Sequence, residues 1–209
     1  MTLRIEHVVT SGIFSLDGED FDVENNIWLL GNDEEVIVFD AAHDHRPILE
    51  GIAGRTLKAI ICTHGHNDHI NAAVELATEA NAPVWLHQDD AMLWDVVHPD
   101  HRVDAPLTDG QEITVAGSSV RVLHTPGHSP GGCSFHVPDL ATVFTGDTLF
   151  NGGPGATGRS FSSRELLVGS IARQLLPLPD ETTVHTGHGD DTTIGAERGP
   201  IAAEAAEIG

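Results

Sequence analysis

Short apolar runs alternate with stretches of helical periodicity along the whole chain. In the first half, runs rich in β-branched residues predict strands at 3–9, 26–30, 36–40 and 57–62, and Pro47 suits the first turn of a helix that begins at Arg46. In the second half, strands are expected at 84–86, 111–115, 119–124, 132–136, 141–145 and 183–185, and helices at 89–97, 163–176 and, weakly, from 193. This alternation favours sheets covered by helices, so the predicted fold class is α/β.

The size and composition of the chain are those of one globular domain. Its 209 residues are enough for one well-cored domain spanning 1–209 and too few for two large ones. A hydrophobic fraction of 40% with 20% charged residues is ordinary, and no apolar stretch is long enough to cross a bilayer. Residues 1–7 lack the basic and apolar segments of a secretory signal, so a cytoplasmic location is expected.

The net charge limits the partners that the protein can bind, and the cysteine spacing indicates the state of its thiols. A formal net charge of −22 opposes binding to nucleic-acid phosphates and to anionic membrane surfaces. We therefore expect a small-molecule substrate, with neither nucleic acid nor membrane as partner, and either a monomer or a homodimer. Cys62 and Cys133 lie beside or within apolar runs without metal-type spacing, which predicts buried free thiols.

The densest chemical signal is the segment Thr63-His64-Gly65-His66-Asn67-Asp68-His69, which follows the strand predicted at 57–62. Imidazole nitrogens and carboxylate oxygens are ligands that zinc and similar metals prefer. In an extended segment, His64 and His66 project to the same side and can hold one ion. Apolar residues at 70, 73, 74 and 77 predict a helix that begins near Asp68 and His69, which would reach a second ion. The alternative is a solvated, histidine-rich loop.

Three further segments at strand ends each offer one potential ligand. They are residues 125–131 with His128, 145–150 with Asp147, and 186–189 with His188. This set, in this order, resembles the metallo-β-lactamase superfamily, specifically its glyoxalase II-like branch, over nearly the whole chain. The resemblance implies a four-layer αββα sandwich with the site at one edge of the two sheets.

The resemblance also implies a ligand set for two divalent metal ions. One ion would be held by His64, His66 and His128, the other by Asp68, His69 and His188, with Asp147 bridging both. Zinc is the expected metal, and iron or manganese also suit these ligands. Asp40, at the end of an early strand, would support the ligand histidines; the alternative role is a simple strand-end cap.

Such a site is hydrolytic machinery. Two metals about 3.5–4 Å apart hold a bridging hydroxide, lower the pKa of its parent water and polarise a carbonyl. Asp68 or Asp147 would orient the nucleophile and act as the catalytic carboxylate. Because a thiolate leaves without a general acid, a site of this kind suits thioesters. The expected enzyme is therefore a metal-dependent thioesterase similar to glyoxalase II.

Residues 146–150, 157–160 and 187–195 look like those of a compact actinobacterial group of such hydrolases. Members of that group are associated with mycothiol and with hydrolysis of its S-acyl or S-formyl conjugates during aldehyde removal. Classical glyoxalase II enzymes hold glutathione with a helical C-terminal region that contains tyrosine, whereas this sequence has no tyrosine. Glutathione recognition by such contacts is therefore not expected.

Two related activities remain as alternatives. A mononuclear iron persulfide dioxygenase of the same fold uses two histidines and one aspartate, and is the main non-hydrolase alternative. Lactone hydrolysis is a further alternative, weakened by the absent tyrosine. A true β-lactamase usually has Cys or Ser in place of Asp147, which argues against antibiotic hydrolysis.

Contacts to the substrate are expected from residues around the mouth of the site. The Gly-rich stretch 151–158 reads as an active-site loop, and it lacks the Lys-Ser/Thr ending of a phosphate loop. The candidate contacts are Asn151, Arg159 and His45, with a solvated surface charge as the alternative for Arg159. The pair His43 and His45 is read as a loop near the mouth in preference to a third metal site. Structural roles are predicted for His124, His136 and His185, and no role is assigned to His43, His87, His98 and His101.

Overall fold

The computed structural model describes residues 2–16, 19–158 and 160–208. The chain divides into two compact units, each built around one six-stranded sheet. The N-terminal unit comprises Met1–Leu107 and Thr114–Ser118, and the C-terminal unit comprises Thr108–Ile113 and Ser119–Gly209. The expectation of a single domain stays a prediction, and each unit is described by itself.

The N-terminal unit contains a mixed sheet whose strands follow chain order. They are β1 (Arg4–Leu16), β2 (Glu19–Gly31), β3 (Glu35–Phe39), β4 (Thr56–Ile61), β5 (Val84–His87) and β6 (Ala105–Leu107). The pairs β1–β2 and β2–β3 are antiparallel, whereas the pairs from β3 to β6 are parallel. Parallel neighbours end at the same edge of the sheet, so the segments after β3, β4 and β5 lie close together.

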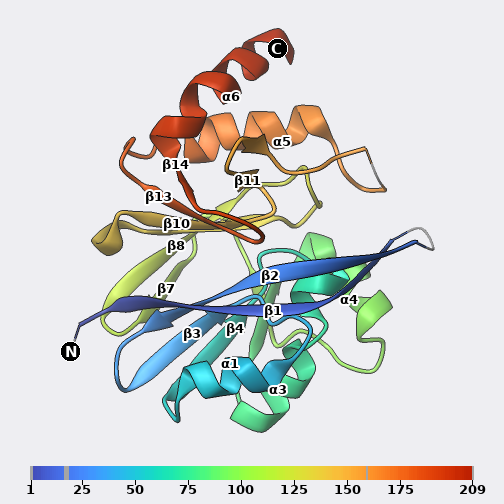
Figure 1. The fold of residues 1–209 in the computed structure, drawn as a ribbon, viewed down its shortest axis with the longest axis vertical. Helices are drawn as coiled ribbons and strands as arrows, with labels where there is room; N and C mark the ends of the chain where they lie inside the picture. Colours follow the sequence, from blue (N-terminus) through green and yellow to red (C-terminus); the bar gives the residue numbers. More distant parts are fainter. Residues whose placement is uncertain (1, 17–18, 159, 209) are drawn as a thin grey trace. The chain divides into compact units, whose positions relative to one another are not determined.

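Helices α1 (His45–Ile52) and α3 (Ala73–Ala80) lie side by side against this sheet (Figure 1). Asp44 caps α1 by accepting a hydrogen bond from the backbone N–H of Arg46. The helices bury Ile48, Ile52 and Leu76 in one core with the strands. The unit is completed by α2 (Asn67–Ile70), the 3₁₀ turn η1 (Gln88–Asp90) and α4 (Ala91–Val97).

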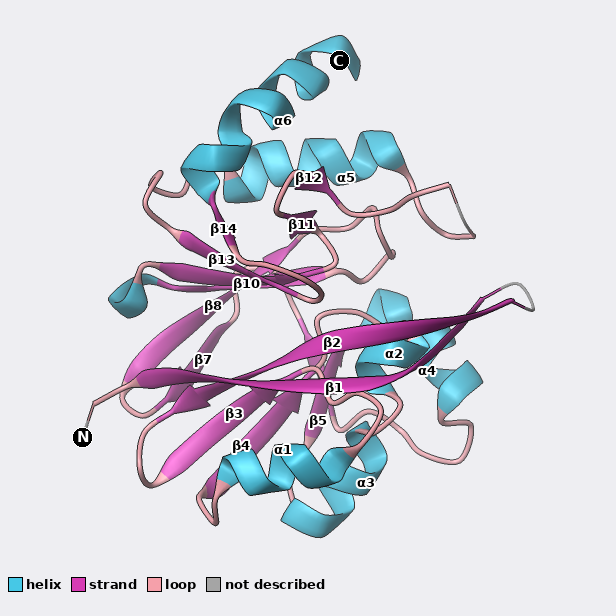
Figure 2. Cartoon of the chain, viewed as in Figure 1, coloured by secondary structure: helices cyan, strands magenta, loops and turns pink. Residues whose placement is uncertain are grey.

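The C-terminal unit has its own sheet, of order β14-β13-β10-β9-β8-β7. These strands are β7 (Glu112–Val115, shared with the other unit), β8 (Ser118–His124), β9 (Cys133–Val137), β10 (Thr142–Gly146), β13 (Thr183–Thr186) and β14 (Thr192–Thr193). Strands β11 (Leu149–Phe150) and β12 (Gly153–Pro154) form a separate ribbon, and η2 (Pro138–Leu140) joins β9 to β10. Helices α5 (Arg164–Ser170) and α6 (Ile194–Ile208), with the π-helical turn η3 (Ile171–Leu175), pack beside this sheet (Figure 2).

The predicted α/β class is confirmed, and most predicted strands and helices occur within a few residues of their expected bounds. One prediction was wrong: the helix expected to run through residues 70–77 is two helices. Backbone hydrogen bonds from Ala41 to His69 (3.1 Å) and from Ala72 to Ala41 (3.0 Å) tie the junction to the end of β3. The helix predicted at 163–176 also changes to a π-helical turn after Ser170.

Three further features were not predicted: the extension of β1 and β2 to a long hairpin, strand β6, and the two-residue strands β11, β12 and β14. Among the helices described, none is long and apolar enough to cross a membrane.

Candidate metal centre

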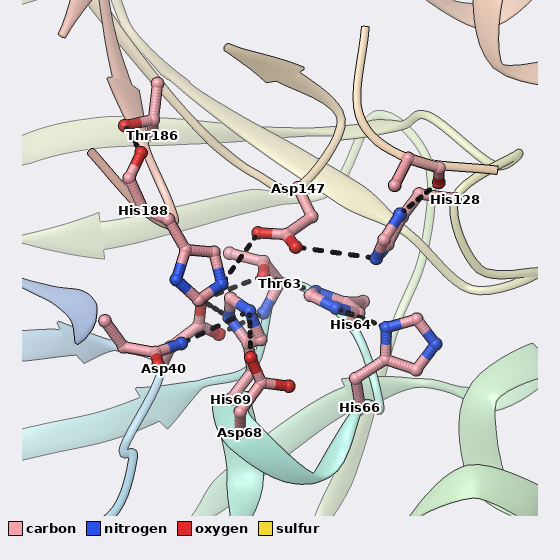
Figure 3. A network of polar contacts seen from close by, with 12 residues as sticks. Asp40, Thr63, His64, His66, Asp68, His69, His128, Asp147, Thr186 and His188 are labelled. Carbon is pink, nitrogen blue, oxygen red and sulfur yellow. Dashed lines mark hydrogen bonds and ion pairs between the residues drawn. The ribbon is translucent and has the colours of Figure 1, made fainter. Parts of the chain in front are cut away.

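The histidine-rich segment leaves the buried end of β4 and turns directly into α2. His64 Nε2 lies 3.0 Å from His66 Nδ1, and Asp68 Oδ2 lies 3.6 Å from His69 Nε2 (Figure 3). The rings of His64 and His69 are 4.1 Å apart between centroids. His64, Asp68 and His69 are buried, and His66 is half-buried. The segment therefore gathers four potential ligands, as the sequence predicted.

Asp40 anchors this cluster from the end of β3. Its Oδ1 accepts a hydrogen bond from Thr63 N (2.7 Å), while Oδ2 accepts from Thr63 Oγ1 and from His69 Nδ1, both at 2.9 Å. Since Nδ1 of His69 donates to a carboxylate, its Nε2 keeps the lone pair that a metal needs. Thr63 Oγ1 in turn lies 3.0 Å from His64 Nδ1, and with its own proton given to Asp40 it accepts from that nitrogen. These contacts are those expected of the supporting role predicted for Asp40.

Asp90 is a further buried carboxylate at the cluster, which the sequence reading missed. Its Oδ2 accepts a hydrogen bond at 2.8 Å from the backbone N–H of Gly65, which lies between the candidate ligands His64 and His66. A Cβ at Gly65 would lie 2.9 Å from Leu93 Cβ, so the helix segment after β5 packs directly on the loop. The sequence shows only two adjacent aspartates after a strand, and nothing in that pattern indicates which one is buried.

Asn25 of β2 was also missed. Its side chain is fully buried, with Nδ2 3.4 Å from His69 Nε2 and Oδ1 2.8 Å from His43 Nε2. His43 has φ +63° and donates its backbone N–H to Asn71 Oδ1. His43, one of the four histidines without an assigned role, is thus part of the polar network around His69.

The C-terminal unit holds a second cluster, centred on Asp147 after β10. Asp147 Oδ2 lies 3.5 Å from His128 Nε2 and Asp147 Oδ1 lies 3.6 Å from His188 Nε2 (Figure 3). His128 Nδ1 is 2.8 Å from the Ala156 carbonyl, to which it donates, so its Nε2 also keeps a lone pair. Each carboxylate oxygen of Asp147 therefore faces a different imidazole.

The donor atoms of both clusters fit divalent metal ions. Ligands about 2.0–2.1 Å from a tetrahedral zinc ion lie roughly 3.3 Å from one another. The four pairs described above are separated by 3.0, 3.6, 3.5 and 3.6 Å. Three of these separations exceed an ordinary hydrogen bond. Nitrogen and oxygen atoms at this spacing suit metal coordination, and the Nδ1 atoms of His64, His69 and His128 are already hydrogen-bonded to the protein.

Two of the candidate substrate residues, His45 and Asn151, make contacts outside these two clusters. His45 Nε2 is paired with Glu79 Oε1 at 2.9 Å and borders a polar hollow with Glu75. Asn151 is exposed and donates to the Asp191 carbonyl at 3.3 Å. Arg159 lies outside the described residues. Their contacts with substrate stay predictions.

The remaining histidines make local contacts. His98 donates a hydrogen bond to the Ile70 carbonyl at 2.8 Å, and His124 donates one to the Pro130 carbonyl at 3.0 Å. His185 Nδ1 lies 2.7 Å from Asp191 Oδ2, and His87 Nδ1 accepts a hydrogen bond from Asp89 N at 3.3 Å. The backbone carbonyl of His101 accepts a hydrogen bond from the Trp94 indole. Partial burial, helped by Arg121, lowers the pKa of His136 and favours its neutral form. Cys62 and Cys133 are buried and form no disulfide, as predicted.

Comparison with known proteins identifies the family. Residues 21–188 match the family described as the Metallo-beta-lactamase superfamily. The chain belongs to this superfamily. Its enzyme class is metal-dependent hydrolase, and the α/β fold agrees with that of solved members.

Two curated relatives cover most of both chains. The sequence is 33% identical over 190 residues to the probable metallo-hydrolase YqgX of Bacillus subtilis, covering 84% of this chain and 90% of the relative. It is 32% identical over 191 residues to the hydroxyacylglutathione hydrolase GloC of Haemophilus influenzae, again covering 84% and 90%.

Solved structures agree with this placement. TTHA1623 in a di-iron-bound form is 34% identical with a TM-score of 0.75, covering 85% of this chain and 93% of that one. The B3 metallo-β-lactamase BLEG-1 is 30% identical with a TM-score of 0.76, covering 90% and 95%. ETHE1 from Myxococcus xanthus is 28% identical with a TM-score of 0.75, covering 87% and 80%.

Proposed function

We propose that this metallohydrolase is a dinuclear thioesterase that cleaves a thioester of a low-molecular-weight thiol. The observation that carries the proposal is the position of Asp147, whose two carboxylate oxygens face His128 and His188 separately. A carboxylate with one oxygen toward each of two imidazoles is arranged to bridge two ions. The similarity to a hydroxyacylglutathione hydrolase supports a thioester as the substrate class.

In this proposal the two ions share seven ligands. The first ion would be held by His64, His66 and His128, the second by Asp68, His69 and His188, and Asp147 would contribute to both. Asp40 supports the arrangement because its hydrogen bonds fix the orientation of His69 and, through Thr63, of His64. Zinc suits these nitrogen and oxygen donors, and the di-iron form of TTHA1623 supports iron as the other candidate.

The chain's own residues would divide the catalytic work. Bound divalent ions supply a Lewis acid for the acyl carbonyl and lower the pKa of a water molecule. The carboxylate of Asp68 or Asp147 would accept a hydrogen bond from the attacking water, orient it and receive its proton. No general acid is needed, because the leaving thiolate is stable near neutral pH. This division suits a site without a nucleophilic serine or cysteine.

For the thiol itself we propose mycothiol, as S-formyl or S-acyl conjugates formed during aldehyde removal. The support is the resemblance of residues 146–150, 157–160 and 187–195 to mycothiol-associated hydrolases, together with the absence of tyrosine from the sequence. The competing thiol is glutathione, which the name of GloC indicates for that relative.

Metal analysis combined with a thiol-release assay tests the proposal. The purified protein would be assayed on S-formyl and S-lactoyl conjugates of mycothiol and of glutathione. We expect about two metals per chain and thiol release, faster from the mycothiol conjugates. One iron per chain, no thiol release and oxygen consumption on a persulfide would instead indicate a dioxygenase.

The variant Asp147→Ala isolates the bridging carboxylate. We expect it to lose at least one metal per chain and most of the thiol-release activity. Asp180→Ala, an exposed aspartate of the same unit that pairs with Arg198, is the control and keeps both. A normal metal count and rate in Asp147→Ala would contradict the proposal.

A further inference from the structure

The Gly-rich segment 151–158 contacts both His128 and Asp147. The Ala156 carbonyl accepts the hydrogen bond from His128 Nδ1 at 2.8 Å. Gly155 packs against the backbone of Asp147, where an added Cβ would lie only 1.8 Å from the Asp147 carbonyl oxygen. A hydrogen bond of 3.1 Å from Gly155 N to the Thr148 carbonyl holds this approach. A displacement of the loop would therefore move the hydrogen-bond acceptor of His128 and the backbone that packs against Asp147.

Helix α6 fixes the first part of this loop through Glu197. The Glu197 side chain is buried, and its Oε1 accepts hydrogen bonds from Gly152 N (3.1 Å) and Thr192 Oγ1 (2.7 Å). A buried carboxylate with two donors holds its position well, because an unpaired charge there would be costly. The loop thus begins at a fixed point on α6.

Arg164, the first residue of α5, fixes the second part. Its Nη1 lies 3.4 Å from the carbonyl oxygens of both Pro154 and Gly155. The same guanidinium makes a two-pronged ion pair with Glu204 of α6, with Nε–Oε1 at 2.6 Å and Nη2–Oε2 at 2.8 Å. A paired fork of this kind restrains the guanidinium more than a single contact would. Hydrogen bonding from Arg164 lowers the pKa of Glu204, so the pair is charged at neutral pH.

We propose that Arg164 is a positioning residue of the metal centre, which, held by Glu204, keeps the Gly-rich loop in place to orient His128. The C-terminal helix α6 then influences metal binding through Glu204, Arg164 and the loop. The inference rests on the proposed function, because it takes His128 and Asp147 as ligands. It assigns the loop a structural task at the metal centre, in addition to the substrate contact predicted for Asn151.

The test compares Arg164→Gln with Arg198→Gln. Arg198 is a matched control: it lies on α6, pairs with a carboxylate (Asp180) at 2.6 Å, and its side chain is 38% exposed against 42% for Arg164. Arg198 bonds the carbonyls of Leu176 and Leu178, away from the loop. Zinc affinity is measured by competition with a chelator, and the His128 Nδ1–H proton is followed by NMR in the zinc-loaded protein.

We expect Arg164→Gln to weaken binding of one of the two zinc ions about tenfold and to speed solvent exchange of the His128 Nδ1–H proton. Arg198→Gln should leave both quantities as in the wild type. Glu204→Gln, which keeps Arg164 but removes its anchor, is a milder variant for use if Arg164→Gln does not fold, and should shift both readouts in the same direction.

Three outcomes would overturn the inference. Equal losses in Arg164→Gln and Arg198→Gln would mean that any loosening of α6 weakens the site. Unchanged zinc affinity and unchanged exchange of the His128 Nδ1–H proton in Arg164→Gln would mean that Arg164 is not needed to hold the loop in place. If the wild type binds no more zinc than Asp147→Ala, the proposed function fails as well; if it binds two ions while Arg164→Gln matches it, only this inference fails.

Discussion

Asp40 combines a positive φ angle with a buried, hydrogen-bonded carboxylate. It has φ +55°, a region that non-glycine residues rarely adopt, and it is 2% exposed. Its carboxylate accepts three hydrogen bonds, two of them from Thr63 and one from His69. Strained backbone of this kind persists where surrounding contacts determine it, and such positions cluster at functional sites.

We predict that Asp40→Asn lowers metal affinity about 10- to 100-fold. All three of its partners are donors, so an amide would turn its NH₂ toward at least one donor and lose that bond. The matched control is Asp44→Asn, because Asp44 caps α1 and asparagine caps helices equally well. Metal titration of both variants checks the prediction; equal affinities would show that Asp40 is only a strand-end cap.

Burial suppresses the reactivity of the Cys62 thiol. The thiol is fully buried, and desolvation, followed by the charge of Asp40, raises its pKa well above the usual value. Because the thiolate is the reactive form, we predict no labelling of Cys62 by a thiol reagent in the native protein at pH 8 and full labelling in denaturant. Mass spectrometry of the labelled peptide gives the result, and rapid native labelling would show that this end of β4 opens readily.

At the scale of elements, local pattern predicted the strands well and the connections less well. Strands β3, β4 and β5 are short apolar runs, and they were predicted to within two residues. The hairpin of β1 and β2 extends through residues 19–24, where four acidic residues flank Phe21 and Val23 and all but Val23 are exposed, so burial in a core does not mark this stretch as a strand. The break between α2 and α3 depends on Ala41, some thirty residues away, which a helical periodicity cannot reveal.

In the candidate site, too, the residues marked by a local pattern were predicted, and the residues that act through burial or distant contacts were missed. The seven ligands could be proposed from the sequence because imidazole and carboxylate groups gather at strand ends, and because their order resembles that of a known family. Asp90 and Asn25 were missed because burial, which no local pattern shows, is what makes them supports of Gly65 and His69. Arg164 was missed because its partners, Gly155 and Glu204, come from separate segments of the chain.

The contact between α5 and the loop before His128 gives a prediction about an element. Gly127 has φ +138°, and an added Cβ would lie 2.3 Å from Leu167 Cα and N. Gly127→Ala should therefore destabilise the protein by on the order of 3 kcal/mol, which corresponds to a fall in melting temperature of roughly 6–12 °C. Calorimetry measures this change.

Gly110→Ala is the control for backbone strain alone. Gly110 also has a positive φ, +75°, but no atom lies within 4 Å of a Cβ built there. We expect a cost of about 1–2 kcal/mol from the left-handed backbone conformation. Equal losses in the two variants would show that α5 moves away from residue 127 at little cost.

At the scale of the whole molecule, the net charge of −22 bears on metal binding. Self-repulsion among carboxylates destabilises a compact state, and bound divalent ions reduce that charge. Ions that bind the folded chain also stabilise it by mass action, by about 2.7 kcal/mol per site when free metal is 100 times the dissociation constant. Both effects predict that metal removal lowers stability.

The two effects can be separated, because binding at the sites depends on the kind of metal ion whereas the reduction of net charge does not. We predict that EDTA lowers the melting temperature by roughly 5–10 °C for each strongly bound ion removed, and that zinc restores it. Magnesium or sodium chloride at equal ionic strength would screen surface charge but would not occupy sites built from imidazole nitrogens. Restoration by magnesium as complete as by zinc would assign the effect to screening and count against the proposed ligands. In Asp147→Ala, zinc should recover only part of the shift, because the bridging carboxylate is lost.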